Sequence, residues 1–294
     1  MALLFNELTK RHPCFASGAK NYKGRIHLPV SPGCNICCNF CQRDVNDDIE
    51  NDRRPGVTNG IITPSEAVET VRRAVELCPD ITVVGVAGPG DTLATPYALE
   101  TFRLVKKEFP DMLACMSTNG LLLREKADEI IATGVDTVTV TVNAVDPDIQ
   151  AKICSEIIWN GERISGRPAA EILIDNQLYG IKALSDAGIT VKVNTVLIPE
   201  INASHISDVT KTVAERGARI YNIIPLIPQH ELNWCSVPTC EQISEARMSA
   251  ERYINVFRHC QRCRADAAGI PGGLDVSAQL YLRPVRLENT FSHG

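Results

Sequence analysis

From about residue 24 onward, short apolar runs alternate along the chain with longer segments whose apolar residues recur every three or four positions. The short runs are typical of buried strands, and the longer segments are typical of amphipathic helices. Residues 63–78, "TPSEAVETVRRAVELC", show the helical pattern, because Thr63 can cap the first turn, Pro64 suits the first position and Glu66 completes a capping box. The pattern therefore predicts a series of strand and helix pairs. Another helix is expected to open at Asp146 and Pro147 and to continue through Cys154, which is expected to be a small core residue.

Six such pairs can be counted, with strands expected within residues 24–34, 81–91, 112–120, 135–144, 189–199 and 218–228. Successive strand and helix units form a parallel sheet with right-handed crossovers, so the fold class is α/β. In such sheets, ligands bind at the carboxyl ends of the strands. That edge should carry the residues with unusual chemistry, namely residues 34–41, 88–91 and 117–119, with Asn143, Asn194 and Pro225.

The charge balance limits the possible partners. The 294 residues include 30 Lys and Arg against 35 Asp and Glu, a net charge of -5. Since no positive excess is available to neutralise phosphates, nucleic acid is not expected as a partner. No apolar run approaches the roughly 20 residues that a membrane span needs, and the start "MALLFNELTKRHP" does not read as a signal peptide. We therefore expect a cytoplasmic protein without membrane contact.

Twelve cysteines are many for such a chain. A chain of this length can bury a core without disulfide bonds, so reduced thiols that bind metal are the better interpretation. Four cysteines lie within residues 31–44, "SPGCNICCNFCQRD", where Cys34, Cys38 and Cys41 have the spacing C-x3-C-x2-C. Cys37 fits only half of this spacing and is expected to be a bystander.

Two kinds of metal site use cysteines at short spacing. A structural zinc site normally has paired C-x2-C units and four protein ligands. Three closely spaced thiolates suit a four-iron cluster with one iron left open. The second interpretation fits the triad better.

A C-x3-C-x2-C triad after the first of six strand and helix units resembles the radical S-adenosylmethionine (SAM) superfamily, whose fold is a partial (β/α)6 barrel. The resemblance implies a [4Fe-4S] cluster on the triad and cleavage of SAM to a 5′-deoxyadenosyl radical. "AGPGD" occupies the place of the glycine-rich motif of that superfamily. The resemblance places SAM against Gly88, Pro89, Gly90, Asp91, Thr118, Asn119, Asn143, Asn194 and Ile198.

Four further motifs narrow the resemblance: "RHPCF" at 11–15, "RRPGVT" at 53–58, "AGPGDTLA" at 87–94 and "CQRCRADAAG" at 260–269. Together with "CMSTNG" and "VKVNTVLIP", they are similar to the maturases that build the core of the nitrogenase cofactor. The resemblance implies fusion of two [4Fe-4S] clusters, with insertion of a SAM-derived carbon, into an eight-iron precursor. One SAM donates a methyl group, and a second yields the radical that abstracts hydrogen.

The same resemblance implies ligands for the two substrate clusters. His12, Cys14 and Cys115 are assigned to one cluster, with Cys14 possible as a shared ligand; Cys260 and Cys263 are assigned to the other. A proton-handling residue is expected nearby. The acidic position of the family's E-x-R-P motif is occupied by Asp52 and followed by Arg54, a departure that leaves Glu50 as a substitute.

The expected organisation is one radical SAM domain over residues 1–294. It divides into an N-terminal cluster-binding extension (1–23), a barrel core (24–228) and a C-terminal cluster-binding extension (229–294), and the extensions are expected to cap the barrel mouth. Because the chain ends soon after "CQRCRADAAG", the carrier domain of some family members is not expected. The implied partners are a cluster donor, an electron donor such as a ferredoxin or flavodoxin, a separate cofactor carrier and downstream scaffold proteins.

Two alternatives stay open. Cys235 and Cys240 are spaced C-x4-C and could join Cys260 and Cys263 around one auxiliary cluster, in a radical enzyme that modifies a peptide or small molecule. The chain could also be an iron-sulfur scaffold without catalysis. That function leaves "AGPGD" and the strand-end asparagines without a purpose.

Overall fold

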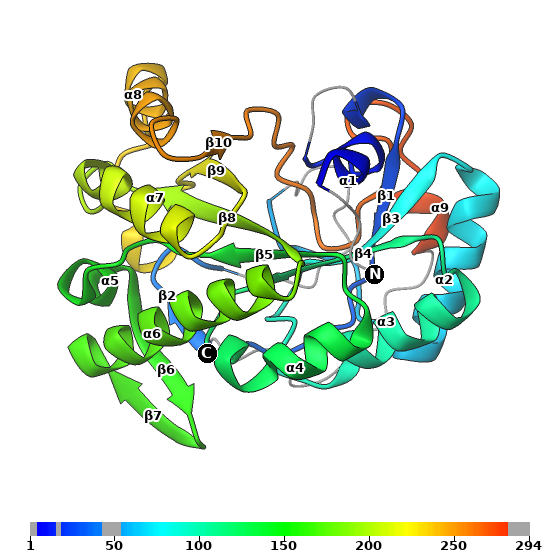
Figure 1. Ribbon diagram of the computed structural model, residues 1–294, viewed down its shortest axis with the longest axis horizontal. Helices are drawn as coiled ribbons and strands as arrows, with labels where there is room; N and C mark the ends of the chain where they lie inside the picture. Colours follow the sequence, from blue (N-terminus) through cyan, green and yellow to red (C-terminus); the bar gives the residue numbers. More distant parts are fainter. Residues whose placement is uncertain (1–4, 16–18, 43–53, 282–294) are drawn as a thin grey trace.

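The structure is a computed structural model that describes residues 5–15, 19–42 and 54–281 (Figure 1). Its main feature is an eight-stranded sheet with the order β10-β9-β8-β5-β4-β3-β1-β11. Six central strands are mutually parallel and lie in the six predicted segments: β1 (Gly24–His27), β3 (Ile81–Val86), β4 (Leu113–Thr118), β5 (Thr137–Thr141), β8 (Thr190–Leu197) and β9 (Ile220–Pro225). The prediction of an α/β fold with a parallel sheet is confirmed.

The sheet does not close into a full barrel. One edge is β10 (Asn255–Val256), parallel to β9, and the other is β11 (Ala268–Gly269), antiparallel to β1. These edge strands lie outside the predicted core of 24–228. The partial barrel therefore has an open side between its two edges.

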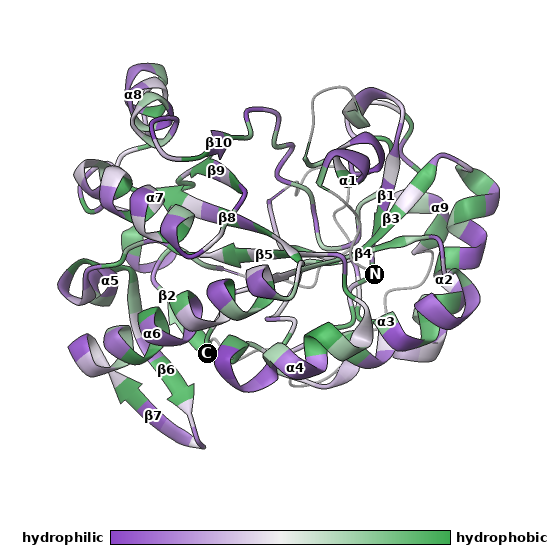
Figure 2. Ribbon diagram, viewed as in Figure 1, coloured by the Kyte–Doolittle hydropathy of each residue, from purple (hydrophilic) through white to green (hydrophobic). Residues whose placement is uncertain are grey.

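Helices α2 (Pro64–Leu77), α3 (Tyr97–Glu108), α4 (Leu123–Thr133), α6 (Gly166–Asp186) and α7 (Ile206–Glu215) cover the outside of the sheet, and α8 (Cys240–Ala250) packs on α7. In Figure 2 helices such as α2 and α4 are hydrophobic on one side and hydrophilic on the other, as expected for helices that pack by one face. The buried apolar core between helices and sheet includes Ile26, Val84, Phe102, Met116, Val138, Val191 and Tyr221.

The helix starts follow local chemistry. Thr63 and Glu66 form the predicted capping box of α2: the Thr63 amide donates to Glu66 Oε2 (2.8 Å), and the Glu66 amide donates to Thr63 Oγ1 (3.3 Å). Helix α5 (Pro147–Ile153) starts after Asp146, whose side chain accepts from the amides of the first turn. Both starts were predicted from the sequence.

A second, three-stranded sheet consists of β2 (Ile36–Cys38), β6 (Cys154–Trp159) and β7 (Glu162–Ser165), and its hairpin projects at the lower left of Figure 1. Cys154, expected in a helix, instead begins β6 and pairs with Cys38. The reason is the turn at Asn160 and Gly161, where both residues have positive φ (52° and 81°). Asn-Gly between two β-rich runs is a strong hairpin signal, which decides the conformation of the preceding residues.

The described parts of the two extensions pack at different places on the sheet. Helix α1 (Phe5–Arg11) lies against the amino ends of the parallel strands, where the Thr82 hydroxyl donates to the Arg11 carbonyl (2.7 Å) and Leu8 packs near Val83 and Leu113. Residues 257–263 run from β10 toward β11, across the open side of the sheet (Figure 1). The apolar face of α1 therefore finds its partners near the amino ends of the strands, whereas Leu232 of the C-terminal extension donates to the Asn39 carbonyl (3.1 Å) beside the cysteine loop.

The remaining short elements are η1 (Ala19–Asn21), η2 (Ala203–His205), η3 (His230–Leu232) and α9 (Ser277–Leu280). In the described part of the chain, no helix has the length and apolar character needed to cross a membrane.

Candidate active site

One cavity of about 300 Å³ occupies the inside of the partial barrel. Its wall includes the cysteine-bearing strand β2, the loop after β3, inward residues of β4, β5 and β8, and segments from both ends of the chain. Most residues predicted to act together therefore line one space, although they are distributed from residue 12 to residue 263.

The cysteine triad lies at one end of this cavity. Cys38 and Cys41 line it, and Asn119 Nδ2 donates to the nearby Cys34 Sγ (3.7 Å). Cys37, between Ile36 and Cys38 on β2, is absent from the cavity wall, as the alternation of side chains along a strand requires. Its predicted role as a bystander agrees with this placement.

The electrostatics of the triad suit the uptake of a cationic iron cluster. A hydrogen bond with Cys154, burial, and the neighbouring Cys154, Cys41 and Cys34 thiols raise the pKa of Cys38 well above its ordinary value. Thiols that resist ionisation because they are buried together become good ligands once a metal cluster neutralises their charge. The donor set therefore fits a thiolate-bound cluster.

The "AGPGD" loop packs directly on the cysteine loop. The Gly90 amide donates to the Ser31 carbonyl (2.7 Å), and the Asp91 amide donates to the Gly33 carbonyl (2.7 Å). A Cβ at Gly90 would lie only 1.9 Å from the Gly33 carbonyl oxygen. Glycine at position 90 is therefore required by the contact between the two loops.

Residues predicted to contact SAM occupy the same end of the cavity, with one exception. Asp91 accepts from the Thr118 hydroxyl (3.0 Å) and from the Asn119 amide (2.6 Å), which joins the loops after β3 and β4. Gly88, Pro89, Gly90, Asn143 and Asn194 also line the wall. Ile198 does not: it is fully buried in an apolar cluster with Ala144 and Leu226.

A second set of thiols lies deeper in the cavity: Cys14, Cys115, Cys260 and Cys263. Burial raises the pKa of Cys14 to about 12; the charge of Lys192 opposes this rise, whereas Cys263 and Cys115 add to it. Burial also raises the pKa of Cys115. Cys14, Cys115 and Cys263 are thus close enough for their charges to interact, although they lie far apart in the sequence.

Two histidines, His12 and His27, line this deeper part of the cavity as different neutral tautomers. His12 Nδ1 accepts from the Cys14 amide (3.1 Å), so the neutral ring carries its proton on Nε2, a buried atom without a partner among the described residues. His27 Nδ1 lies 3.0 Å from the Arg264 carbonyl, which can only accept, so its proton is on Nδ1 and Nε2 keeps a lone pair. Burial is the main cause that lowers the pKa of His12 to about 3 and that of His27 to about 4.

His27 is a candidate ligand that the sequence analysis missed. A ring whose second nitrogen donates to a carbonyl is the usual arrangement of a metal-binding histidine. The signal was available, because "GRIH" places Arg25 and His27 on the same side of an otherwise apolar strand. The assignment of His12 as a ligand stays a prediction. In the tautomer described above, its Nε2 carries the proton and can donate a hydrogen bond but cannot bind a metal.

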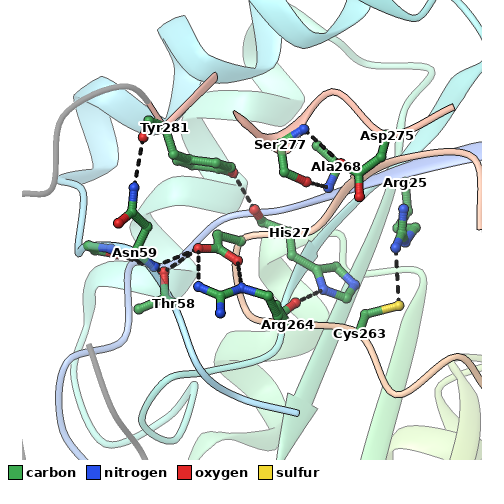
Figure 3. A network of polar contacts seen from close by, with 12 residues as sticks. Arg25, His27, Thr58, Asn59, Cys263, Arg264, Ala268, Asp275, Ser277 and Tyr281 are labelled. Carbon is green, nitrogen blue, oxygen red and sulfur yellow. Dashed lines mark hydrogen bonds and ion pairs between the residues drawn. The ribbon is translucent and has the colours of Figure 1, made fainter. Parts of the chain in front are cut away.

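Figure 3 shows how the C-terminal motif is held beside the first strand. Arg25 donates to Cys263 Sγ (3.1 Å), and a buried ion pair joins Arg264 to Asp266 (2.9 Å). The Asp266 carboxylate also accepts from the Asn59 amide (2.6 Å) and the Thr58 hydroxyl (3.2 Å). The "RRPGVT" and "CQRCRADAAG" motifs are therefore in direct contact.

The other predicted residues lie elsewhere. Asp52 and Glu50 fall outside the described residues, and Arg54 donates to Gln229 Oε1 (3.4 Å). Cys235 is buried in the apolar cluster of Ile198 and Leu226, and Cys240 is exposed on α8; neither lines the cavity.

Within 5–15, 19–42 and 54–281, no three His, Cys, Asp or Glu side chains are arranged to hold a single metal ion.

Comparison with known proteins identifies the class. Residues 28–213 match the family described as the Radical SAM superfamily. A radical SAM methyltransferase from Sphaerobacter thermophilus and Streptococcus suis SuiB bound to S-adenosylmethionine have related folds, with TM-scores of 0.58 at 16% and 12% identity. These matches cover 80% and 82% of this chain and 65% and 52% of those chains. The chain therefore belongs to the radical SAM superfamily, whose members use a [4Fe-4S] cluster and SAM.

Curated relatives narrow the assignment. The FeMo cofactor biosynthesis protein NifB of Methanocaldococcus infernus is 42% identical over 266 residues, which cover 90% of this chain and 87% of the relative. The NifB protein of Bradyrhizobium diazoefficiens is 44% identical over 273 residues, covering 90% of this chain but 54% of the relative. The chain belongs to the NifB family, and it spans most of the first relative and about half of the second.

Proposed function

We propose that this chain makes the eight-iron precursor of the nitrogenase iron-molybdenum cofactor, by fusing two [4Fe-4S] clusters and inserting a carbon derived from SAM. The relatives are named for FeMo cofactor biosynthesis. One observation about this chain carries the proposal further: the cavity has the cysteine triad at one end and a second set of thiols deeper inside. Soft ligands of this kind suit iron-sulfur substrates that must meet at one radical centre.

In this proposal the two ends of the cavity have different tasks. Cys34, Cys38 and Cys41 hold the resident cluster, which supplies the electron for SAM cleavage. The glycine loop, Asp91 and the strand-end residues Thr118, Asn119, Asn143 and Asn194 orient SAM. Bound there, SAM would supply a methyl group for the iron-sulfur substrate and, from a second molecule, the means to remove hydrogen from that carbon.

The deeper thiols hold the substrates. Cys14 and Cys115 take one cluster together with a histidine, and Cys260 and Cys263 take the other. We favour His27 over His12 as the nitrogen ligand, because the Arg264 carbonyl holds the proton of His27 on Nδ1 and leaves Nε2 to bind. Proton transfer is assigned to Asp52 or Glu50, with Arg54, which follows Asp52 by two positions in the sequence.

The proposal also implies partners: a cluster donor, a ferredoxin or flavodoxin that supplies electrons, a carrier that accepts the precursor, and scaffold proteins that complete the cofactor. The auxiliary-cluster alternative has less support, because Cys235 lies in a separate apolar cluster from Cys260. A scaffold without catalysis leaves the contacts between the glycine loop and the cysteine loop without a function.

The test is product analysis after anaerobic cluster reconstitution. With reductant and SAM added, we expect both S-adenosylhomocysteine and 5′-deoxyadenosine, each dependent on loading of the deeper thiols. Formation of 5′-deoxyadenosine alone would retain the radical enzyme but favour the auxiliary-cluster alternative. Formation of neither product would contradict the proposal.

A further inference from the structure

Lys192 is a buried lysine to which the proposed function gives no task. It lies on β8, is 6% exposed and lines the deeper part of the cavity. Its Nζ is 5.7 Å from the centre of the Phe15 ring and 5.3 Å from that of Phe257. Taking an ammonium group out of water is unfavourable unless an anion or several hydrogen bonds compensate.

The described residues offer Lys192 no such anion. No carboxylate in that part of the chain forms an ion pair with it, and the carboxylate in the cavity wall, Asp91, is engaged by Thr118 and Asn119 at the other end. The two aromatic rings compensate for only part of the lost hydration. The position of Lys192 therefore suits a cavity that receives a negatively charged group.

The surroundings indicate where that group binds. Phe15 adjoins Cys14 in sequence, and the charge of Lys192 acts on both Cys14 and Cys115. Beside Cys263 the nearest cation is a different one, because Arg25 donates to its Sγ (3.1 Å). Lys192 thus acts on both Cys14 and Cys115, Arg25 has a smaller effect on Cys14, and Arg25 is the cation bonded to Cys263.

We infer that Lys192 is a positioning residue that acts as the counter-cation of the substrate cluster on Cys14 and Cys115. The inference rests on the proposed function and adds a residue to it. Each electron that enters a thiolate-bound cluster adds a negative charge, and a fixed cation in a water-poor cavity favours the reduced state. Lys192 therefore holds this cluster in place and makes it easier to reduce than it is without the cation.

The experiment compares Lys192→Met, which keeps the length and loses the charge, with Lys192→Arg, which keeps the charge. Full-length protein is reconstituted anaerobically, desalted, and titrated with reductant while EPR follows each cluster. We expect Lys192→Met to shift the potential of the Cys14 cluster to a more negative value and to lower the iron retained after desalting several-fold. Lys192→Arg should stay close to the wild type in both respects.

Two controls separate electrostatics from packing. Phe257→Leu removes a ring near Lys192 but leaves the lysine charge in place. If the charge is what matters, the reduction potential of the Cys14 cluster should not change in this variant. The apoprotein of Lys192→Met should unfold at a temperature no lower than the wild type, because it no longer buries a charge. An unchanged Cys14-cluster potential in a folded Lys192→Met protein overturns the inference.

The wild type distinguishes failure of the inference from failure of the proposed function. If the wild type holds only the triad cluster after reconstitution, the proposed function fails and the inference fails with it. If the wild type holds the substrate clusters and forms both SAM products, while Lys192→Met matches its potentials, only the role of Lys192 is rejected.

Discussion

Gly85 determines where the ring of His27 can lie. It sits on β3 between His27 on β1 and Cys115 on β4, with which it is paired in register. A Cβ at position 85 would be 3.0 Å from His27 Cδ2 and 3.5 Å from Nε2. The missing side chain thus makes room for an imidazole beside the cysteine on the next strand.

We expect Gly85→Ala to displace the His27 ring, because the new Cβ would lie 3.0 Å from His27 Cδ2, closer than an ordinary van der Waals contact. Overpacking of this kind costs about 1–3 kcal/mol in the free energy of unfolding, measurable by urea denaturation. In the reconstituted protein, nitrogen coupling to the substrate cluster should weaken in pulsed EPR. Gly273→Ala is the control, because its new Cβ meets Ile270 Cγ2 at an ordinary 3.4 Å. Unchanged nitrogen coupling would argue against His27 as a ligand.

The triad gives a second prediction with a matched control on the same strand. Cys34→Ala, Cys38→Ala and Cys41→Ala should each abolish SAM cleavage while the deeper thiols still load iron. Cys37→Ala should leave cleavage within twofold of the wild type, because that side chain does not reach the cavity wall. Quantifying 5′-deoxyadenosine decides, and retained cleavage in any of the three triad variants would defeat the assignment.

At the residue scale, the sequence predicted the positions of the cysteines better than those of the histidines and of Lys192. The spacing of Cys34, Cys38 and Cys41 predicts their common location at one end of a cavity. No spacing reveals that Lys192 and His27 face the same cavity as Cys14, since that depends on the register of strands far apart in sequence. Nor does a motif reveal which ring nitrogen of His12 carries the proton, because a single backbone amide decides it.

At the scale of elements, the capping box of α2 makes a prediction about pH. Hydrogen bonds from the Thr63 amide and hydroxyl lower the pKa of Glu66. A lowered carboxyl pKa contributes stability above the unfolded-state value, and this contribution is lost as the pH falls through the folded-state value. Glu66 is exposed, so solvent screening limits the effect to a few tenths of a kcal/mol.

Thr63→Ala should therefore lower the free energy of unfolding by about 1 kcal/mol at neutral pH. Glu66→Gln should keep the cap, since glutamine can accept the same amide hydrogen bond, but should lose this pH dependence. Urea denaturation at pH 7 and near pH 4 tests both variants. If the free energy of unfolding falls by the same amount between pH 7 and about pH 4 in Glu66→Gln and in the wild type, the Glu66 carboxylate is not the source of this pH dependence.

The elements themselves were largely predictable. All six parallel strands and the starts of α2 and α5 follow from apolar periodicity and capping residues. The β6–β7 hairpin was missed because the helical periodicity before Cys154 was extended too far, although Asn160-Gly161 carries the turn signal. A local signal of that kind outweighs periodicity where the two disagree.

At the scale of the whole molecule, the proposed function predicts that changes in the segment across the open side of the barrel affect precursor formation but not SAM cleavage. Cys260→Ala and Cys263→Ala should keep the triad cluster and its cleavage of SAM but lose the eight-iron precursor. Iron content and 5′-deoxyadenosine measure the first property, and activation of cofactor-free nitrogenase measures the second. Cys240→Ala, on the exposed surface of α8, serves as the control. Unimpaired precursor yield in Cys260→Ala or Cys263→Ala would remove these thiols from the site.

Sequence alone could not tell at which end of the barrel helix α1 packs. That outcome depends on which apolar surface remains uncovered once the sheet has formed, and residues at the start of β3, β4 and β9 provide it for Leu8 and Phe15. Motifs thus indicated the candidate ligands in the deeper cavity, and tertiary packing decided their position.

The closure of the open side by residues 257–263 has a consequence for biosynthesis. Cys14 is synthesised before the triad loop, whereas Cys263 is synthesised only after every strand from β1 to β10. The triad loop can therefore fold with its neighbours before the deeper cavity is closed. On the proposed function, we expect the substrate clusters to be enclosed only after residues 257–263 have been synthesised.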